Sequence, residues 1–314
     1  MSDRIVICEC FARDGLQHEE TFVPTAQKVE IIDLCTQAGF PRIEATSYSR
    51  PDHVPAFRDA NEVLRAIRRR PGVYYKATCP NPRAVERALA DLDAGFGANE
   101  LSLLVSASEE HSQRNLRSSR DAQWHNVEEM VRRAGGRFRL IGVISVAFGC
   151  PIEGRVDPGV VAADAARFAG LGVEHVALAD TTGLGTPISI KHLFERIASD
   201  VPRLTTIAHF HNSRGTGLAN CLAALEAGCR HFDSSFGGVG GHPAMIQYGE
   251  GMTGNVATED LVNLFESLGH STGLDLDLVL KASHRCEEIL GRELLSMVAR
   301  AGFGLLPARE DTNV

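Results

Sequence analysis

The sequence lacks the features that place a protein in or across a membrane. No uninterrupted apolar stretch approaches the roughly 18 residues that a membrane-spanning helix needs. Residues 1–4 lead directly into the apolar alternation that starts at Ile5, without the charged segment and long apolar run of a secretory signal. We therefore expect a cytoplasmic protein without a membrane partner.

An excess of positive charge is also missing. The net charge of −8 provides no basic surface for nucleic acid, so we expect no nucleic-acid partner. The eight cysteines are scattered without a CxxC pair, which argues against a zinc ribbon or a thioredoxin-type redox site and predicts reduced thiols in the core. A GxxxxGK[ST] phosphate loop is absent as well. Small molecules and a second copy of the chain remain as partners.

What the chain does contain is a repeated alternation of short β-branched runs and longer segments of helical period. This alternation is typical of βα units around a parallel sheet. With 314 residues and 44% hydrophobic residues, the chain can bury one large core. Eight repeats favour a closed (β/α)₈ TIM barrel over an open doubly wound sheet. We expect one domain over residues 1–314, with the barrel at about residues 4–270 and added C-terminal helices at about 275–305.

The expected strands are the short runs rich in Val, Ile, Thr and aromatic residues. They are Ile5–Phe11, Arg42–Thr46, Tyr74–Thr78, Glu100–Val105, Leu140–Ala147, His175–Ala179, Thr205–His209 and His231–Ser235.

The clearest expected helices have a glycine or a proline at their ends, where such residues mark helix boundaries. They are Thr25–Ala38 before Gly39, Pro158–Leu171 before Gly172, Pro187–Ser199, and Ser213–Ala227 before Gly228. In a TIM barrel the active site lies at the carboxyl ends of the strands and in the loops that follow them. Residues at those ends are therefore the first candidates for chemistry.

Two histidines stand at the end of one expected strand. His209 and His211 are two residues apart, so on a strand their side chains point to the same side of the sheet. Two neutral imidazoles side by side suit a borderline divalent ion. Two unrelated histidines at a strand end would have the same spacing, so this motif alone leaves both interpretations open.

Carboxylates at other strand ends favour the metal. Asp14 follows the first expected strand, Glu44 lies in the second and Asp180 closes the sixth. A buried charge is costly unless it is paired or bound to a metal. A single carboxylate of this kind is compatible with a structural ion pair. Three of them beside two histidines on one face favour a metal and acid–base site.

A long glycine-rich segment follows the last expected strand, from Gly237 to Gly254. A dinucleotide-binding GxGxxG motif belongs after the first strand of its fold, so this position argues against a phosphate cradle. We interpret the segment as a flexible active-site lid.

Taken together, these motifs resemble those of the 3-hydroxy-3-methylglutaryl-CoA lyases, within the wider group of metal-dependent TIM-barrel lyases and synthases. The resemblance covers roughly residues 5–273 and keeps the order of the family's segments. The matching segments are Arg13–Gln17, Ile43–Ser47, Ser106–Glu109 with Gln113–Asn115, Gly149–Pro151 with Glu153-Gly154, Asp180-Thr181, His209–His211 and Gly254–Asp260.

The resemblance implies a metal site and a reaction. Its metal ligands would be Asp14, His209, His211 and Asn255, with water and substrate oxygens completing an octahedral site for Mg²⁺ or Mn²⁺. The substrate would be an acyl-CoA, cleaved at a carbon–carbon bond after its tertiary hydroxyl loses a proton. The base would be His211 or Asp14. The family also implies a homodimer.

The resemblance assigns further roles around the metal. Arg13 would neutralise the enolate oxygen, and Glu44 and Asp180 would position metal-bound groups or relay protons. The resemblance also implies substrate contacts for three more residues, namely Gln17, Ser108 and Asn115.

The sequence departs from the family in the glycine-rich segment. Where the lyases have a cysteine that protonates the product carbanion, this chain has His242 in a segment that is about four residues longer. An imidazole has an ordinary pKa near 6.5 and is able to donate that proton, so His242 becomes the expected general acid. Val143 and Ala177 stand where the lyases carry hydroxyl-bearing side chains, which predicts a drier pocket.

The leading hypothesis is thus a 3-hydroxy-3-methylglutaryl-CoA-type lyase that releases acetyl-CoA and an oxoacid. A citramalyl-CoA lyase and a Claisen-type condensing synthase are alternatives. Such synthases usually carry a long C-terminal region, and the shortness of the chain after its barrel favours the lyase. A non-catalytic barrel scaffold is the hypothesis from another class. The complete set of Asp14, His209, His211 and Asn255 argues against it.

Overall fold

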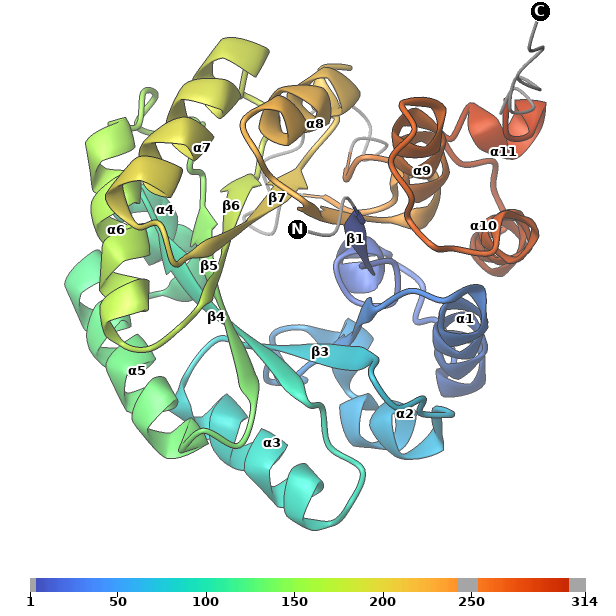
Figure 1. Ribbon diagram of the computed structural model, residues 1–314. Helices are drawn as coiled ribbons and strands as arrows, with labels where there is room; N and C mark the ends of the chain where they lie inside the picture. The colour runs from blue at the N-terminus through green and yellow to red at the C-terminus, as the bar shows by residue number, and fades with distance from the viewer. Residues whose placement is uncertain (1–3, 242–253, 305–314) are drawn as a thin grey trace, which may run out of the picture.

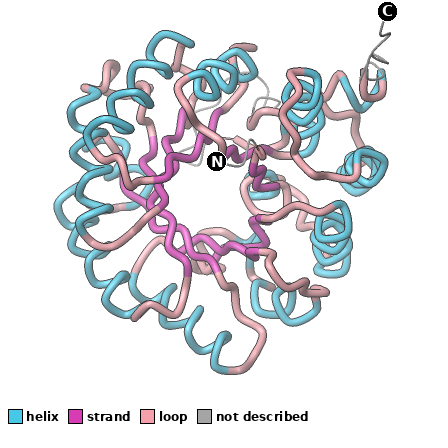
Figure 2. Tube along the Cα trace, viewed as in Figure 1, coloured by secondary structure: helices cyan, strands magenta, loops and turns pink. Residues whose placement is uncertain are grey.

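The computed structural model describes residues 4–241 and 254–304, and these contain a closed eight-stranded parallel barrel. Each strand pairs with the next along the chain, and β1 pairs with β8 to close the ring. Figures 1 and 2 show the ring of strands inside a layer of helices. The predicted TIM barrel is therefore confirmed. The strands are β1 (Val6–Glu9), β2 (Arg42–Ser47), β3 (Tyr74–Cys79), β4 (Glu100–Ser106), β5 (Arg139–Ser145), β6 (His175–Asp180), β7 (Thr205–Phe210) and β8 (His231–Ser234).

Helices follow the strands and cover the outside of the barrel. The described residues contain eleven α-helices and three 3₁₀ turns. The α-helices are α1 (Thr25–Ala38), α2 (Ala60–Ala66), α3 (Pro82–Asp93), α4 (Glu109–Leu116), α5 (Arg120–Ala134), α6 (Pro158–Gly170), α7 (Pro187–Asp200), α8 (Gly217–Glu226), α9 (Thr258–Ser267), α10 (Leu276–Leu290) and α11 (Val298–Ala301). The 3₁₀ turns are η1 (Gly15–His18), η2 (Pro55–Phe57) and η3 (Phe236–Gly238).

Local signals explain where several helices begin and end. Helix α1 ends at Gly39, which has a φ of +93° and donates its backbone N–H to the last turn of the helix. Asp157 caps α6 by accepting the Gly159 N–H, and Pro158 occupies the first helical position. These two boundaries agree with the sequence prediction to within one residue.

Two predicted boundaries were wrong because side chains form turns there. Helix α8 begins at Gly217 instead of Ser213, since the Asn212 side chain accepts the Gly217 N–H at 2.9 Å and holds the intervening residues in a turn. Strand β1 ends at Glu9 instead of Phe11, since the Glu9 carboxylate accepts the Phe11 N–H at 2.8 Å. In both cases a local side-chain bond replaces a ladder or helix bond.

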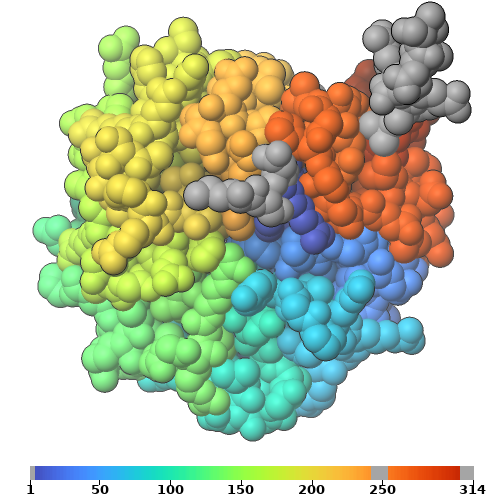
Figure 3. All heavy atoms as spheres, in the orientation of Figure 1, coloured from blue at the N-terminus to red at the C-terminus, as the bar shows by residue number. Residues whose placement is uncertain are grey.

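The helical layer closes where the two ends of the barrel meet. Helices α1 and α10 pack together, and Figure 1 shows them side by side. In the space-filling view the C-terminal helices lie against the N-terminal residues. Side chains fill the ring that the ribbon leaves open, apart from the part that grey atoms cover (Figure 3). None of the helices within residues 4–241 and 254–304 is long and apolar enough to span a membrane.

The barrel interior has an apolar half and a charged half. Ile141, Ala177 and Ile207 on β5, β6 and β7 form an apolar cluster of their own, with Val143 packed against it. The buried charged side chains come instead from β2, β3, β4 and β8, and they pair across the inside of the barrel. They are Arg42, Glu44, Lys76, Glu100 and Asp233.

Candidate functional site

A cavity of about 620 Å³ opens at the carboxyl ends of the strands. Its walls come from several strand ends and following loops, including Asp14 after β1, Asn115 on α4 and the two histidines at the end of β7. A cavity of this volume fits a small ligand. Its position matches the place where TIM barrels carry their active sites.

Three possible metal ligands meet in this cavity. The Oδ2 atom of Asp14 lies 3.8 Å from Nε2 of His209 and 3.7 Å from Nε2 of His211. These ligand atoms all lie within 4.8 Å of one another. Since Asp14 comes from the β1 loop and the histidines from β7, barrel closure is what brings them together.

The fourth expected ligand also reaches this group. Asn255 pairs with His211 in an isolated antiparallel bridge, and its Nδ2 donates to Asp14 Oδ2 at 2.6 Å. Its Oδ1 is buried and has no hydrogen-bond partner. A buried amide oxygen without a partner is costly, and a divalent cation would satisfy it. The donor set of one carboxylate, one amide oxygen and two imidazoles therefore fits a divalent metal.

Charge in the cavity favours an ionised Asp14. Burial alone would raise the pKa of Asp14, but Arg13, His211 and His209 outweigh burial and hold this pKa well below its ordinary value. For His209, burial alone would lower the pKa, but Asp233 and Asp14 raise it. A proton and a metal ion compete for the same imidazole nitrogen. The negative charge of Asp233 and Asp14 would therefore stabilise a metal ion on His209 as it stabilises a proton there.

Asp233 was not among the residues that the sequence singled out. Its Oδ2 accepts the Nδ1–H of His209 at 3.3 Å, which leaves Nε2 of His209 facing Asp14. Arg42 and Lys76 form ion pairs with Asp233 at 3.2 and 3.3 Å. The only signal in the sequence was a carboxylate two residues after His231, within an expected strand.

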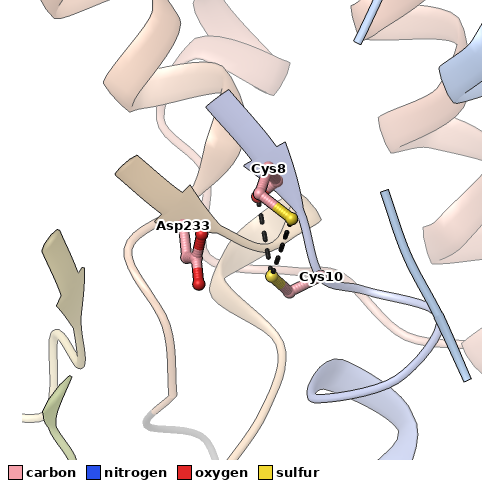
Figure 4. Close-up of side chains that lie close together, drawn as sticks. All are labelled: Cys8, Cys10 and Asp233. Atoms are coloured by element: carbon pink, nitrogen blue, oxygen red, sulfur yellow. Dashed lines mark hydrogen bonds between the residues drawn. The ribbon is translucent and has the colours of Figure 1, made fainter. Parts of the chain in front are cut away.

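A second group of possible metal ligands lies beneath the first. Figure 4 shows Cys8 on β1 and Cys10 just after it, both near Asp233 on β8. The two sulfur atoms are 3.9 Å apart. Burial raises the pKa of Cys10 well above its ordinary value, so this thiol keeps its proton, and Asp233 is already paired with Arg42 and Lys76. We therefore assign this group to the structural interior of the barrel.

The other cysteines fit the same description. All eight are buried and free, which confirms the prediction of reduced core thiols.

Arg13 connects the metal ligands with the charged half of the barrel. Its Nη1 donates to Asp14 Oδ1 at 2.9 Å and to Gln17 Oε1 at 3.0 Å. Its Nε lies 2.8 Å from Glu44 Oε1, which also accepts the Thr78 hydroxyl at 2.8 Å. Arg13 and Gln17 line the cavity, and Glu44 supports Arg13 from below.

Other expected site residues are placed differently. Asp180 directs its two oxygens to the backbone N–H groups of Leu184 and Gly185, at 2.8 and 3.0 Å, and so shapes the loop after β6. Ser108 caps α4 through the His111 N–H and is buried outside the cavity lining. Asn115 does line the cavity. His242 lies outside the described residues.

The described ends of the glycine-rich segment pack tightly at the site. A Cβ atom on Gly240 would lie 2.6 Å from Nδ2 of Asn255, and Gly240 has a φ of +129°. A Cβ atom on Gly254 would lie 2.0 Å from the Gly240 carbonyl oxygen. These two glycines are therefore required for close backbone approach beside Asn255.

A (β/α)₈ barrel with such a donor set at its strand ends defines a metal-dependent TIM-barrel enzyme. Comparison with known proteins identifies the family. Residues 4–285 match the HMGL-like family model, and the chain belongs to this family of carbon–carbon lyases. The family depends on a divalent metal.

Two relatives agree with this assignment. The chain is 38% identical to the mitochondrial hydroxymethylglutaryl-CoA lyase of Rattus norvegicus over 299 residues, which cover 95% of this chain and 89% of the relative. It is 36% identical to the cytoplasmic 3-hydroxy-3-methylglutaryl-CoA lyase of Mus musculus, over 96% of this chain and 86% of the relative.

A solved structure is similar over nearly the whole chain. It is an HMG-CoA lyase from Acinetobacter baumannii in complex with coenzyme A and 3-methylmalate, with 37% identity and a TM-score of 0.89. The match covers 98% of both chains.

Proposed function

We propose that the protein cleaves 3-hydroxy-3-methylglutaryl-CoA, or an acyl-CoA closely related to it, into acetyl-CoA and an oxoacid, with Mg²⁺ or Mn²⁺ as the metal. The observation that carries the proposal is the group of Asp14, His209 and His211 beside the unpartnered Oδ1 of Asn255. Oxygen and imidazole donors of this kind suit either ion. The substrate class is taken from the names of the relatives, since the mitochondrial and the cytoplasmic relative are both hydroxymethylglutaryl-CoA lyases.

The site would bind the metal through Asp14, His209, His211 and Asn255. When bound, the metal acts as a Lewis acid that acidifies the tertiary hydroxyl of the substrate. The base that takes the hydroxyl proton would be His211 or Asp14, and both line the cavity.

Cleavage breaks the bond between C2 and C3 of the acyl group. The hydroxyl carbon becomes a ketone, and the electron pair of the broken bond remains on the acetyl-CoA fragment as an enolate. Arg13 lines the cavity, and its guanidinium can offset the negative charge on the enolate oxygen. Glu44 holds Arg13 in this position through the 2.8 Å ion pair. Protonation of the enolate carbon then gives acetyl-CoA, a step for which the sequence nominates His242.

The proposal also covers the location and the oligomeric state of the protein. We infer a cytoplasmic homodimer, in line with the expectation from the sequence, although relatives occur in mitochondria as well as in the cytoplasm. Size-exclusion chromatography with light scattering tests the dimer.

The decisive experiment is a cleavage assay with mass spectrometry of the products. Purified protein would be stripped with EDTA, reloaded with Mg²⁺ or Mn²⁺ and incubated with 3-hydroxy-3-methylglutaryl-CoA and with citramalyl-CoA. We expect acetyl-CoA and the matching oxoacid only in the metal-loaded samples. Metal binding without cleavage of either thioester would contradict the proposal and favour a scaffold. A condensing synthase would instead show product formation from acetyl-CoA and an oxoacid.

A further inference from the structure

A charged side chain that the reaction above does not use lines the inner part of the cavity. Lys76, on β3, is almost fully buried. Its Nζ lies 3.3 Å from Asp233 Oδ2 and 3.5 Å from Glu44 Oε1. An ammonium group has three N–H donors, and these two carboxylates take two of them. One donor therefore remains on a group that borders the cavity.

Asp233 and Glu44 do not fully compensate the charge of Lys76, because each of them also pairs with an arginine. Asp233 has a second cation in Arg42 at 3.2 Å, and Glu44 has a second cation in Arg13 at 2.8 Å. Both carboxylates are thus already paired without Lys76. Burial alone would lower the pKa of Lys76, but the adjacent carboxylates raise it well above its ordinary value, so the ammonium stays charged. An anionic ligand in the cavity would complete its pairing.

A hydroxyl on the neighbouring strand has no partner at all. The Oγ atom of Ser102 on β4 is buried and makes no hydrogen bond, and Ser102 lines the same cavity. Ser102 stands opposite Thr78 in the β3–β4 register, and Thr78 lies two residues after Lys76 on the same side of its strand. The hydroxyl of Thr78 is already donated to Glu44. Ser102 is therefore the free polar group on this wall.

The inner part of the wall next to it is apolar, and the hydroxyl-bearing Ser145 and Thr181 line the cavity further out, at the ends of β5 and β6. Leu104, Val143 and Ala179 line the cavity on β4, β5 and β6, above the apolar cluster in the barrel. A ligand with an anionic end and an alkyl group would fit such a cavity in one orientation. Its anionic end would face β3 and β4, and its alkyl group would face β5 and β6.

We propose that Lys76 and Ser102 form the binding subsite for a free carboxylate on the acyl group of the substrate. The enzyme then selects acyl-CoAs that carry such a carboxylate, and the wall of Leu104, Val143 and Ala179 receives the alkyl substituent on C3. This inference rests on the proposed lyase function and specifies its substrate class.

The test compares two thioesters that differ only in the carboxylate. One is 3-hydroxy-3-methylglutaryl-CoA. The other is 3-hydroxy-3-methylbutyryl-CoA, in which a methyl group replaces the carboxymethyl group, so that cleavage gives acetone and acetyl-CoA. The kcat/KM ratio of the two is measured for the wild type, Lys76→Met and Ser102→Ala. A charge-assisted hydrogen bond is worth about 10- to 100-fold, so we expect the ratio to fall by that factor in Lys76→Met. In Ser102→Ala we expect a fall of about 3- to 10-fold.

A matched control separates recognition from folding. Lys28 forms another buried ion pair, with Asp59 at 2.7 Å, and neither residue lines the cavity, so Lys28→Met removes a buried ammonium outside the cavity lining. We expect Lys28→Met to lower stability without changing the ratio. Binding of Mn²⁺, followed by electron paramagnetic resonance, is expected to persist in Lys76→Met and in Ser102→Ala. If Lys76→Met does not fold, Ser102→Ala still tests the subsite.

Binding without turnover distinguishes a failed subsite from a failed function. Isothermal titration calorimetry of both thioesters, with EDTA present, would show tighter binding of the carboxylated one to the wild type and a loss of this preference in Lys76→Met. That result supports the subsite even if neither thioester is cleaved, which would refute only the lyase proposal. Equal affinity of the wild type for the two thioesters would overturn the subsite. So would a loss of affinity in Lys76→Met that is the same for both thioesters.

Discussion

Asp233 on β8 accepts the Nδ1–H of His209 on β7 at 3.3 Å, and this bond leaves the Nε2 atom of His209 facing Asp14. A metal-binding histidine commonly donates its other ring N–H to a carboxylate, which fixes the tautomer and the orientation of the ring. Asp233 is itself held by Arg42 and Lys76. The orientation of one metal ligand thus depends on the charged half of the barrel.

We expect Asp233→Asn to weaken Mn²⁺ binding by about 10- to 100-fold, the usual effect of losing such a carboxylate. Calorimetric titration of the metal-free protein with Mn²⁺ measures this directly. Asp164→Asn is the matched control, because Asp164 is a buried carboxylate that pairs with Arg120 at 3.0 Å on α5 and not with a metal ligand. Equal Mn²⁺ affinity in wild type and Asp233→Asn would show that His209 needs no such support.

Removal of a metal ligand is expected to abolish activity and leave the barrel folded. In His211→Ala the site loses one imidazole while the core keeps its apolar contacts, so we expect turnover to fall at least about 100-fold. Metal content by mass spectrometry and melting temperature by circular dichroism are the measurements. His284→Ala, on the outer face of α10, serves as control. Full metal occupancy with near-normal turnover in His211→Ala would refute the ligand assignment.

Glu44→Gln tests whether the support of Arg13 is functional. The amide keeps the shape of the side chain but removes the charge that pairs with Arg13 at 2.8 Å. We expect kcat to fall about 10- to 100-fold, the worth of a charge-assisted contact, with a smaller effect on the melting temperature. Should specific activity stay unchanged while the protein loses stability, the role of Glu44 is structural.

Gly240→Ala is expected to disturb Asn255. The added Cβ would lie 2.6 Å from the Asn255 side chain, in a backbone conformation with φ +129°. We expect metal affinity to fall about tenfold or more as Asn255 is displaced. Gly95→Ala is the control, because Gly95 also has a positive φ, of +86°, with nothing within 4 Å of the added atom. It is expected to lose only about 1 kcal/mol of stability, with normal metal binding. A Gly240→Ala protein with wild-type metal affinity would contradict the packing argument.

Stability is expected to depend on pH through two buried carboxyls. Burial raises the pKa of Glu9 to about 8 and that of Glu259 to about 7, from ordinary values near 4.5. A group with a raised folded-state pKa stabilises the fold fully below its unfolded pKa, and this stabilisation is lost as pH rises through the folded pKa. Burial lowers the pKa of His111, His175 and His231 from 6.5 to about 4, and these groups oppose the effect of the two carboxyls below pH 6.5. The free energy of unfolding is therefore expected to decrease between about pH 6.5 and 8.

Urea denaturation across this pH range measures the effect. Glu9→Gln removes one of the two titrating groups, so its stability is expected to change less steeply with pH than that of the wild type. Identical slopes in the two proteins would exclude Glu9 as a source of the pH dependence.

The amino-acid sequence alone determined the repeat architecture and the core of the site. Strand and helix periods, with glycine and proline at helix ends, are local properties, and they predicted α1 exactly as observed. The spacing of His209 and His211 placed both side chains on one side of a strand because strands alternate strictly. The position of Asp14 after the first strand made it a candidate ligand, and the family motifs added Asn255, whose Nδ2 donates to Asp14 Oδ2 in the structure.

Only the tertiary structure decided which charged residues of the strands face one another. Glu44, Lys76 and Asp233 come from three strands, and their contacts depend on the register of each strand and on the closure of β8 against β1. A sequence shows that a strand contains a charge, but the pairing of that charge depends on residues up to 191 positions away, as for Arg42 and Asp233. The unpartnered Ser102 hydroxyl depends in the same way on what surrounds it in space. The side-chain contacts of the inner cavity wall therefore depend on long-range strand register, whereas the barrel architecture could be predicted from local periodicity.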